Sequence, residues 1–169
     1  EEKSRYDSHK NDPNDENYRK FLSRVTDPLL DRIKPGQRGL DFGCGPGPAI
    51  SVVLKEKGFE VDDYDLYYRP DTKLEENSYD FITSTEVFEH FYKPGLEIEK
   101  IWSLLKSGGT LGVMTLFYPE TKDEFSKWWY KNDPTHVCFF NEDVFQFIAN
   151  KLGAKLEIVS NQVAFLTKE

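Results

Sequence analysis

The sequence predicts an α/β fold built on a mostly parallel sheet with helices on both faces. A short apolar strand pattern, Gln37–Phe42, runs through a glycine-rich turn into a helical pattern, Ala49–Lys57. The strand pattern Phe59–Asp65 follows, and such a β-loop-α-β unit makes its two strands parallel with a right-handed crossover. The chain ends in two short strand patterns, Lys155–Ser160 and Gln162–Lys168, whose tight connection makes them antiparallel neighbours.

The first part of the chain, residues 1–35, is expected to form an arm followed by helices. Residues 1–16 are polar and punctuated by Asn, Asp and Pro, which predicts an extended arm. Two interpretations of Arg5–His9 stay open, a solvated tail or a flap over a ligand. From Asn17 the apolar residues follow helical spacing, and Asp27-Pro28 fits an N-cap with proline at the first position of a second helix.

The glycine-rich turn has the spacing G-x-G-x-G, given by Gly43, Gly45 and Gly47, with Asp41 two residues before the first glycine. Glycine accepts positive φ and lets a ligand lie against the backbone. The N–H groups of the turn and of the following helix favour negative or polar ligand groups. A dinucleotide-binding turn has the different spacing G-x-G-x-x-G. A tight turn that binds nothing is the alternative interpretation.

Asp65 closes the second predicted strand, at the carboxyl end where open α/β sheets bind ligands. A carboxylate at this place can accept hydrogen bonds from both ribose hydroxyls of a nucleoside held on the glycine turn. Asp62 and Asp63 are the competing candidates, as solvated residues of the same strand. Residues 66–78 are too few for a full helix and strand, so this region is expected to be shortened.

The stretch Tyr79–Phe91 begins as an apolar strand and becomes polar where the strand meets the ligand crevice. It resembles the F-D-x-[IV]-x-x-x-E-V-x-E-H segment of the class I S-adenosylmethionine (SAM) dependent methyltransferases, and the glycine turn resembles motif I of the same family. With two motifs at the family's spacing, residues 36–112 are identified as a member of this family. The resemblance implies a three-layer, Rossmann-like methyltransferase fold that binds SAM and releases S-adenosylhomocysteine (SAH).

The resemblance also assigns cofactor-binding residues: Tyr6, Asp41, Gly43, Cys44, Gly45, Asp65, Leu66, Thr85 and Glu86. Further along, Pro94–Lys106 is predicted as a helix and Thr110–Phe117 as a strand, joined by a turn similar to the family's K-P-G-G-x-L. Asn141 is expected to cap a last helix that ends at Gly153. An antiparallel hairpin at the end of a parallel sheet is the family's architectural mark.

Residues 118–140 form a long, aromatic connection, and long loops in compact domains are usually lids or binding loops. We expect Trp128, Trp129 and Tyr130 to bind the substrate, although a small satellite core at the edge of the sheet is the alternative. The segment Asp133–His136 resembles the D-P-x-H-x-x-F pattern of a subset of these methyltransferases, and Asp133 is expected to orient the imidazole of His136.

Methyl transfer from a sulfonium is an in-line displacement in which positioning can account for much of the rate. A hydroxyl, amine or acidic C–H acceptor is helped by a general base. The candidates are His136, His90, Glu89 and Glu86. The His–Glu neighbours also fit a metal site, but no three ligands show a recognisable spacing, and we expect no metal.

The chain of 169 residues has a formal net charge of −8 and a pI of about 5.0, which argues against a nucleic-acid partner. Its length predicts one domain, residues 1–169. Cys44 and Cys138 suggest neither a zinc site nor a disulfide framework. Without a membrane-length apolar run or a signal peptide, the expected location is the cytoplasm. The start at Glu1 without methionine leaves room for an upstream domain.

The leading hypothesis is a SAM-dependent methyltransferase that acts on a small molecule, with the acceptor atom and the oligomeric state open. The alternative is a non-catalytic SAM-binding module, or the cofactor half of a larger enzyme. A nicotinamide oxidoreductase is disfavoured by the glycine spacing and by the segment from Glu86 to His90.

Overall fold

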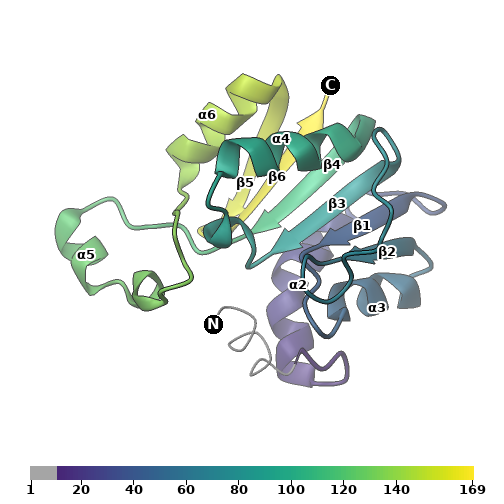
Figure 1. Cartoon of the computed structure of the whole chain (residues 1–169), viewed down its shortest axis with the longest axis horizontal. Coiled ribbons are helices and arrows are strands. Elements are labelled where there is room, and N and C mark those ends of the chain that lie inside the picture. Colours follow the sequence, from purple (N-terminus) through teal and green to yellow (C-terminus); the bar gives the residue numbers. More distant parts are fainter. Residues whose placement is uncertain (1–10) are drawn as a thin grey trace.

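The computed structural model describes residues 11–169, and its six strands form one mixed sheet in the order β2-β1-β3-β4-β6-β5 (Figure 1). The strands are β1 (Arg38–Phe42), β2 (Glu60–Tyr64), β3 (Tyr79–Thr85), β4 (Leu105–Met114), β5 (Ala154–Ser160) and β6 (Val163–Lys168). Strands β1 to β4 pair in parallel, whereas β6 is antiparallel to both β4 and β5. The predicted parallel sheet with an antiparallel C-terminal hairpin is confirmed.

Helices cover both faces of the sheet, which gives three layers (Figure 1). The helices are α2 (Glu16–Leu30), α3 (Ala49–Glu56), α4 (Pro94–Leu104), α5 (Lys122–Lys127) and α6 (Glu142–Leu152), with 3-10 turns η1 (Phe88–His90) and η2 (Trp129–Asn132). Side chains of a strand alternate between faces. Phe81 therefore packs in the apolar cluster under α2 and α3, while Ile82 packs in the cluster under α4 and α6.

Residues 65–78 contain turns and one isolated bridge, Asp65 to Arg69, in place of a helix and a strand. The predicted shortening is confirmed, and it leaves β2 at the edge of the sheet. Ion pairs line this edge, from Arg38 to Asp62 at 2.6 Å and from Lys55 to Asp63 at 3.6 Å. Charges of this kind discourage strand addition to an open edge.

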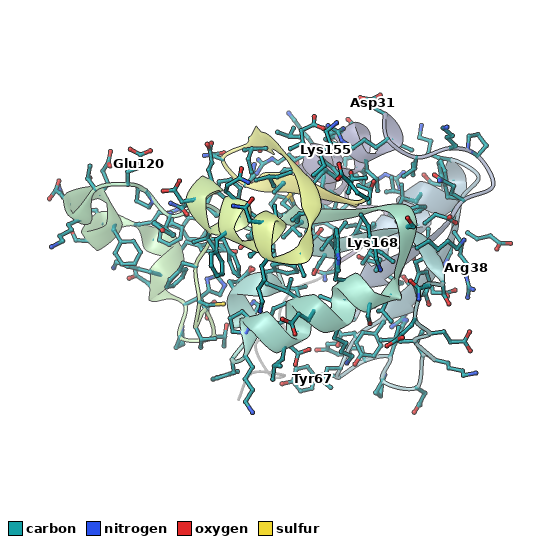
Figure 2. All side chains as sticks on the ribbon, turned by 90° about the horizontal axis from the view of Figure 1, so that it is seen from above. Asp31, Arg38, Tyr67, Glu120, Lys155 and Lys168 are labelled. Atoms are coloured by element: carbon teal, nitrogen blue, oxygen red, sulfur yellow. The ribbon has the colours of Figure 1, made fainter. Side chains whose placement is uncertain are left out.

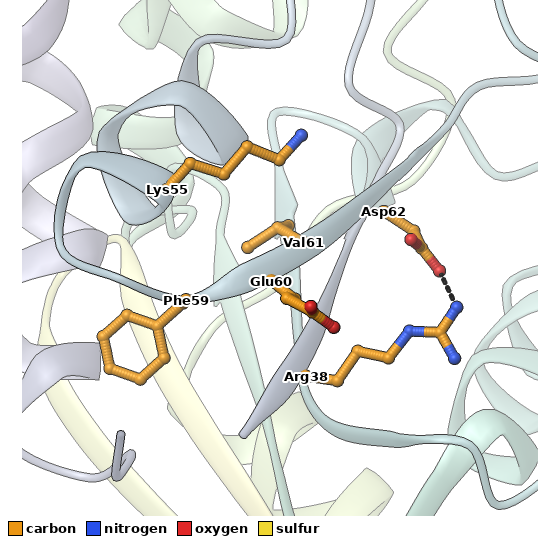
Figure 3. A pocket seen from close by; sticks show the side chains of 6 residues that line it. All are labelled: Arg38, Lys55, Phe59, Glu60, Val61 and Asp62. Atoms are coloured by element: carbon orange, nitrogen blue, oxygen red, sulfur yellow. Dashed lines mark hydrogen bonds and ion pairs between the residues drawn. The ribbon is translucent and has the colours of Figure 1, made fainter. Parts of the chain in front are cut away.

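A cavity of about 510 Å³ flanks the β2 edge, with the Arg38–Asp62 pair on one side and Lys55 above it (Figure 3). Arg38 and Glu60 begin β1 and β2, so this cavity lies toward the amino ends of the strands. The glycine turn, by contrast, lies at the carboxyl ends of these strands. This cavity therefore holds none of the predicted site residues.

Helix α2 differs from the prediction, because it continues through Asp27-Pro28 without a break. Its N-cap is Asp15, whose Oδ1 accepts from the backbone N–H of Asn17 at 2.8 Å. Pro28 lies only two residues before the helix ends, where its missing N–H costs one hydrogen bond. Val25 and Leu29 are both fully buried four residues apart, and this shared face requires a continuous helix.

The later elements follow the sequence closely, with shifted boundaries around β4. Helix α4 ends at Leu104 and β4 begins at once, five residues before the predicted Thr110. This extension pairs Leu105 with Tyr79 of β3, and the register between the two strands shifts between Tyr79 and Phe81. Asn141 caps α6 through Val144 N at 3.0 Å, and Gly153 ends it with φ 64°, as predicted. In residues 11–169 no helix combines the length and apolarity needed to cross a bilayer.

Candidate functional site

The glycine turn lies at the carboxyl ends of β1 and β2 and is tied to β2 by backbone hydrogen bonds. The N–H groups of Gly43 and Cys44 donate to the carbonyl of Tyr64 at 2.7 and 3.1 Å. Gly43 has φ 85°, and a Cβ there would lie 2.3 Å from Cγ2 of Val87, in the segment after β3. Only glycine combines this backbone conformation with this close approach.

Asp65 is the acidic residue of the β2 region that contacts the glycine turn. Its Oδ2 accepts from the N–H of Gly45 at 2.9 Å, and its Oδ1 accepts from the N–H of Tyr67 at 2.8 Å. Asp62 instead pairs with Arg38, and Asp63 pairs with Lys55. Asp62 remains 34% exposed in its ion pair, whereas the side chain of Asp63 is 14% exposed. The contact with Gly45 favours Asp65 as the acid beside a ligand on the turn.

Asp41 is a buried carboxyl group beneath the turn, with 4% of its surface exposed. Its Oδ1 accepts from the hydroxyl of Thr83 at 3.0 Å. Burial raises the pKa of Asp41 to about 7, and the neighbouring charges of Asp63 and Asp65 act in the same direction. Burial also raises the pKa of the Tyr18 hydroxyl, with Asp41 and Glu86 as the charges that add to it. A cationic ligand would stabilise this group of acids.

The chain just before α2 crosses the glycine turn. A Cβ on Gly45 would lie 2.8 Å from Asn11 Nδ2, and one on Gly47 would lie 2.1 Å from the Asn11 carbonyl oxygen. Tyr6 and the proposed flap Arg5–His9 lie outside the described residues. The position of Asn11 brings the chain that follows them directly over the predicted cofactor turn.

The other predicted cofactor residues occupy different environments around the turn. Cys44 is buried, and burial raises the pKa of its thiol, so that it stays protonated. Leu66 is 66% exposed in the turn after β2. Thr85 ends β3 with its Oγ1 buried, and within residues 11–169 that atom has no hydrogen-bond partner. A buried donor without a partner at a ligand crevice is expected where a bound ligand completes the bonding.

Beyond β3 lies a group that we call the Glu–His cluster, defined as Glu86, Glu89, His90, Tyr130 and His136. Tyr130 Oη lies 2.9 Å from Glu86 Oε2 and 2.5 Å from Glu89 Oε1. One phenol proton cannot serve two ionised carboxylates. Burial raises the pKa of both glutamates, and the charge of Glu86 raises that of Glu89 further, so the cluster holds an additional proton.

The two histidines of the Glu–His cluster are each oriented by a backbone carbonyl. His90 Nδ1 lies 3.0 Å from the carbonyl oxygen of Thr135, and His136 Nδ1 lies 2.8 Å from that of Tyr130. A carbonyl can only accept, so Nδ1 is the donor in both rings. The rings contact each other edge to face, with centroids 4.9 Å apart, and burial lowers the pKa of His136.

Asp133 lies in the turn that carries His136. Asp133 Oδ1 accepts from the backbone N–H and the hydroxyl of Thr135 at 2.9 and 2.7 Å, which shapes this turn. The Tyr130 carbonyl accepts from the imidazole, and burial lowers the pKa of His136 while the charge of Asp133 raises it. That Asp133 orients the imidazole stays a prediction.

The insert, residues 118–140, extends away from the layered body at the end of the sheet to which β3 and β4 point, as α5 shows in Figure 1 and Glu120 in Figure 2. Its base is closed by Tyr118 N, which donates to the Phe140 carbonyl at 2.8 Å. Its returning part is bound to η1, because the N–H groups of Val137 and Cys138 donate to the Glu89 carbonyl at 2.8 and 3.2 Å. This return brings His136 to His90.

The three aromatic residues predicted to bind substrate are placed differently. Trp128 packs against Phe125 and Phe139 in an aromatic cluster within the insert. Trp129 is 69% exposed, and Tyr130 is buried in the Glu–His cluster. Trp129 and Tyr130 share a cavity of about 500 Å³ with residues from α2 and from the ends of β4 and β5. Its lining residues are Phe21, Arg24, Glu86, Leu116, Trp129, Tyr130, Asn161 and Gln162.

Several cavity residues were missed by the sequence analysis. Phe21 and Arg24 looked like ordinary positions of an amphipathic helix, and Arg24 Nη1 donates to Gln162 Oε1 at 3.2 Å. Only the long-range pairing of the β5–β6 turn with the end of β4 brings these residues together. Glu86 belongs both to this cavity and to the Glu–His cluster, so the cavity opens directly onto that cluster.

Comparison with known proteins agrees with this architecture. A family model described as Methyltransferase domain matches residues 15–159. The YcgJ protein of Bacillus subtilis is 16% identical, with a TM-score of 0.60 over 81% of this chain and 70% of that one. A SAM-dependent methyltransferase of Thermotoga maritima is 17% identical, with a TM-score of 0.56 over 88% and 89% of the two chains.

A phosphoethanolamine N-methyltransferase of Haemonchus contortus, in complex with phosphomonomethylethanolamine and SAH, is 21% identical. Its TM-score is 0.57 over 80% of this chain but 37% of that one. No curated protein sequence matched the chain. Structural likeness at these identities shows the fold, whereas the family match covers most of the sequence. The chain therefore belongs to the methyltransferase domain family and has the fold of the class I SAM-dependent methyltransferases.

Proposed function

We propose that the chain transfers a methyl group from SAM to a small-molecule acceptor. The observation that carries this proposal is the position of Glu86, between the two halves of the site. On one side burial raises the pKa of the Tyr18 hydroxyl, and the charges of both Glu86 and Asp41, the acid beneath the glycine turn, raise it further. On the other side Glu86 lines the cavity of about 500 Å³. A cofactor on the turn and an acceptor in the cavity would meet there.

The glycine turn and Asp65 fit the adenosine part of SAM. Asp65 would accept hydrogen bonds from the ribose hydroxyls, and its contact with Gly45 N–H already holds it against the turn. Leu66, exposed after β2, is then available to the base. Tyr6, outside the described residues, is proposed as a further cofactor-binding residue. The bound cofactor supplies an activated methyl group, and the residues of the chain hold and orient it.

The methionine part of SAM carries a sulfonium and an ammonium group, both cationic. Asp41 and Glu86 are acids whose pKa is raised mainly by burial. A nearby cation favours the ionised form of such groups. Gly43 and Cys44 line the same part of the turn, and Thr85 Oγ1 offers a buried donor at the end of β3. These residues are proposed to hold the methionine part.

The cavity supports a small acceptor with an apolar or aromatic part. Its volume lies within the range of about 300–1,000 Å³ typical of small-molecule pockets. Trp129, Tyr130 and Phe21 supply aromatic surface, and Arg24 supplies a cation for an anionic group of the acceptor. In this proposal residues 1–169 act as one domain, the insert is the acceptor-side lid, and Trp128 supports Tyr130 through a ring contact with centroids 5.2 Å apart.

Three general-base candidates, His136, His90 and Glu89, form one contiguous group beside this cavity. Burial lowers the pKa of His136, which keeps the ring neutral near pH 7 and able to accept a proton. The proton of a hydroxyl or amine acceptor would therefore pass into the Glu–His cluster as the methyl group is transferred.

The test is binding followed by turnover. SAM or SAH should raise the melting temperature, because a ligand that binds only the folded chain stabilises it, and NAD should not. A melting temperature that rises with NAD but not with SAH would contradict the proposed function. Turnover with radiolabelled SAM on a panel of aromatic and anionic metabolites then separates an enzyme from a non-catalytic SAM-binding module, or from the cofactor half of a larger enzyme.

A further inference from the structure

We propose that Glu89, His90 and His136 bind a first-row divalent transition-metal ion at the end of the acceptor cavity. The binding site follows from the three side chains alone. Its use in methyl transfer, to hold an oxygen atom of the acceptor, rests on the proposed function.

The donor atoms of the three residues lie within 4.8 Å of one another. The separation of His90 Nε2 from Glu89 Oε1 is 3.9 Å. Nitrogen and oxygen ligands bind such ions at about 2.0–2.2 Å, so neighbouring ligands in a tetrahedral or octahedral site lie about 3.0–3.5 Å apart. A pair of donors near the 4.8 Å limit would therefore have to close by roughly 1.5 Å, through rotation of the three side chains.

Both imidazoles have the tautomer that a metal ligand needs. Their Nδ1 atoms donate to the carbonyl oxygens of Thr135 and Tyr130, at 3.0 and 2.8 Å. Nε2 is then the ring atom that can bind an ion. Metal-binding histidines commonly donate their other N–H to a backbone carbonyl, which fixes the ring orientation. A general base needs only one such ring, whereas two rings held in this way beside one carboxylate suit an ion.

The two segments that carry the ligands are held together independently of any ion. Glu89 and His90 lie in η1, and His136 lies in the returning part of the insert. The carbonyl of Glu89 accepts from Val137 N and Cys138 N at 2.8 and 3.2 Å. Cys138 Sγ also donates to the Phe88 carbonyl at 3.1 Å. The site is therefore largely preformed, which lowers the cost of binding.

The charge of the surroundings also favours a cation. Glu86 and Glu89 both contact the hydroxyl of Tyr130, and Glu89 is fully buried. In the part of the chain that the structure describes, neither glutamate forms an ion pair with a lysine or arginine, and Arg24, which lines the same cavity, is the cation whose charge acts on Glu86. A dication would offset these two acids. Glu86 also lines the cavity, so ligand positions left open on the ion would face the acceptor.

The ligand set selects the kind of ion. Imidazole nitrogens suit Mn²⁺ to Zn²⁺ better than Mg²⁺, which prefers oxygen ligands and keeps several waters. Two histidines and one carboxylate with open positions form a set known for non-haem iron and for catalytic zinc. We therefore expect Mn²⁺, Co²⁺ or Zn²⁺ to bind, and Mg²⁺ to bind at least about tenfold more weakly.

The experiment is a titration of the chelator-treated full chain with Mn²⁺, followed by electron paramagnetic resonance and by calorimetry. We expect one Mn²⁺ per chain. His136→Gln and His90→Gln should each weaken Mn²⁺ binding at least about tenfold, because each removes a ligand. His9→Gln is the matched control, since it removes the remaining histidine of the sequence, outside the described residues. Stoichiometric binding that all three variants retain would overturn the proposal, as would no binding by the wild-type chain.

SAH binding is measured on the same samples to separate the two proposals. A histidine variant that loses Mn²⁺ but keeps SAH affinity is folded, and its loss is specific to the metal site. A wild-type chain that binds SAH but no Mn²⁺ refutes the metal site and leaves the proposed function standing. A chain that binds Mn²⁺ but no SAH supports the metal site and refutes the methyltransferase proposal.

Discussion

Asp41 gives the sharpest prediction for stability, because it is the most deeply buried acid next to the glycine turn. Asp41→Asn keeps the size of the side chain and an oxygen that can accept a hydrogen bond from Thr83 Oγ1, which lies 3.0 Å from Asp41 Oδ1. The substitution removes only the ability to ionise. Its effect should therefore depend strongly on pH.

The magnitude follows from the pKa of Asp41, which burial raises from 3.8 to about 7. A group whose pKa is higher in the folded state contributes stability that is fully present below its unfolded pKa. That stability is lost as the pH rises through the folded value. At 1.36 kcal/mol for each pH unit, the total loss is about 4 kcal/mol, of which about 3 kcal/mol falls between pH 5 and pH 8. The variant should escape this loss.

The assay is urea unfolding of both proteins at pH 5 and pH 8, with the difference in unfolding free energy taken at each pH. That difference should shift by about 3 kcal/mol in favour of the variant at pH 8. Asp80→Asn is the control. Burial raises the pKa of Asp80, but the Arg38 N–H and Lys106 together hold it below its usual value. It is ionised at both pH values, so its effect should not change. Equal pH dependence of wild type and Asp41→Asn would show that the pKa of Asp41 is not raised in the folded chain.

Three further substitutions test the turn, the acid and a helix end. Gly45→Val should abolish SAH binding measured by calorimetry and leave the far-UV circular dichroism unchanged. The reason is that a β-branched side chain at φ 64° would reach into the ligand space over the turn. Normal SAH affinity of the variant would mean that the turn is purely structural. Asp65→Ala should weaken SAH binding by roughly 1.5–3 kcal/mol, the scale of charge-assisted hydrogen bonds, and Asp63→Ala should weaken it less. A larger effect of Asp63→Ala would show that Asp63, and not Asp65, binds the ribose. Gly153→Ala should lower the unfolding free energy measured in urea by about 1 kcal/mol, because φ 64° disfavours any Cβ although the space there is open. Gly95→Ala within α4 should instead stabilise the folded chain. Equal effects of the two substitutions would contradict the backbone argument.

Most of the fold was predictable because its signals are local. The strand–turn–helix unit around Gly43 and the cap at Asn141 each depend on a few adjacent residues, and both lie where the patterns indicated. The shortened region 65–78 followed from chain length alone. Pro28 was misjudged because a local rule competed with packing. Val25 and Leu29 share one buried face of α2, and burial of that face outweighs one lost backbone hydrogen bond.

The candidate site was predictable on its cofactor side and less so on its acceptor side. Asp65 lies beside the glycine turn because parallel neighbours end at the same edge of the sheet, a consequence of topology. The contact of His136 with His90 depends instead on where a long insert returns, which no periodicity encodes. A metal-site spacing in a sequence is recognisable when the ligands lie on one element. Here Glu89 and His90 lie in η1 and His136 lies in the insert, so the sequence shows no such spacing.

Three unfavourable local features lie near the glycine turn and the end of β3. Glu86 has a positive φ of 54°, which is uncommon for a non-glycine residue. Asp41 is buried with its pKa raised, and Thr85 Oγ1 is buried without a partner among residues 11–169.

Two other acids of the sheet form ion pairs, Asp62 with Arg38 and Asp80 with Lys106. Within residues 11–169, Asp41 and Glu86 form no ion pair with a lysine or arginine. Strain and unpaired charge persist in folded proteins mainly where a ligand resolves them. A cationic cofactor above Asp41 and a divalent ion beside Glu86 would resolve both kinds of charge with two bound groups.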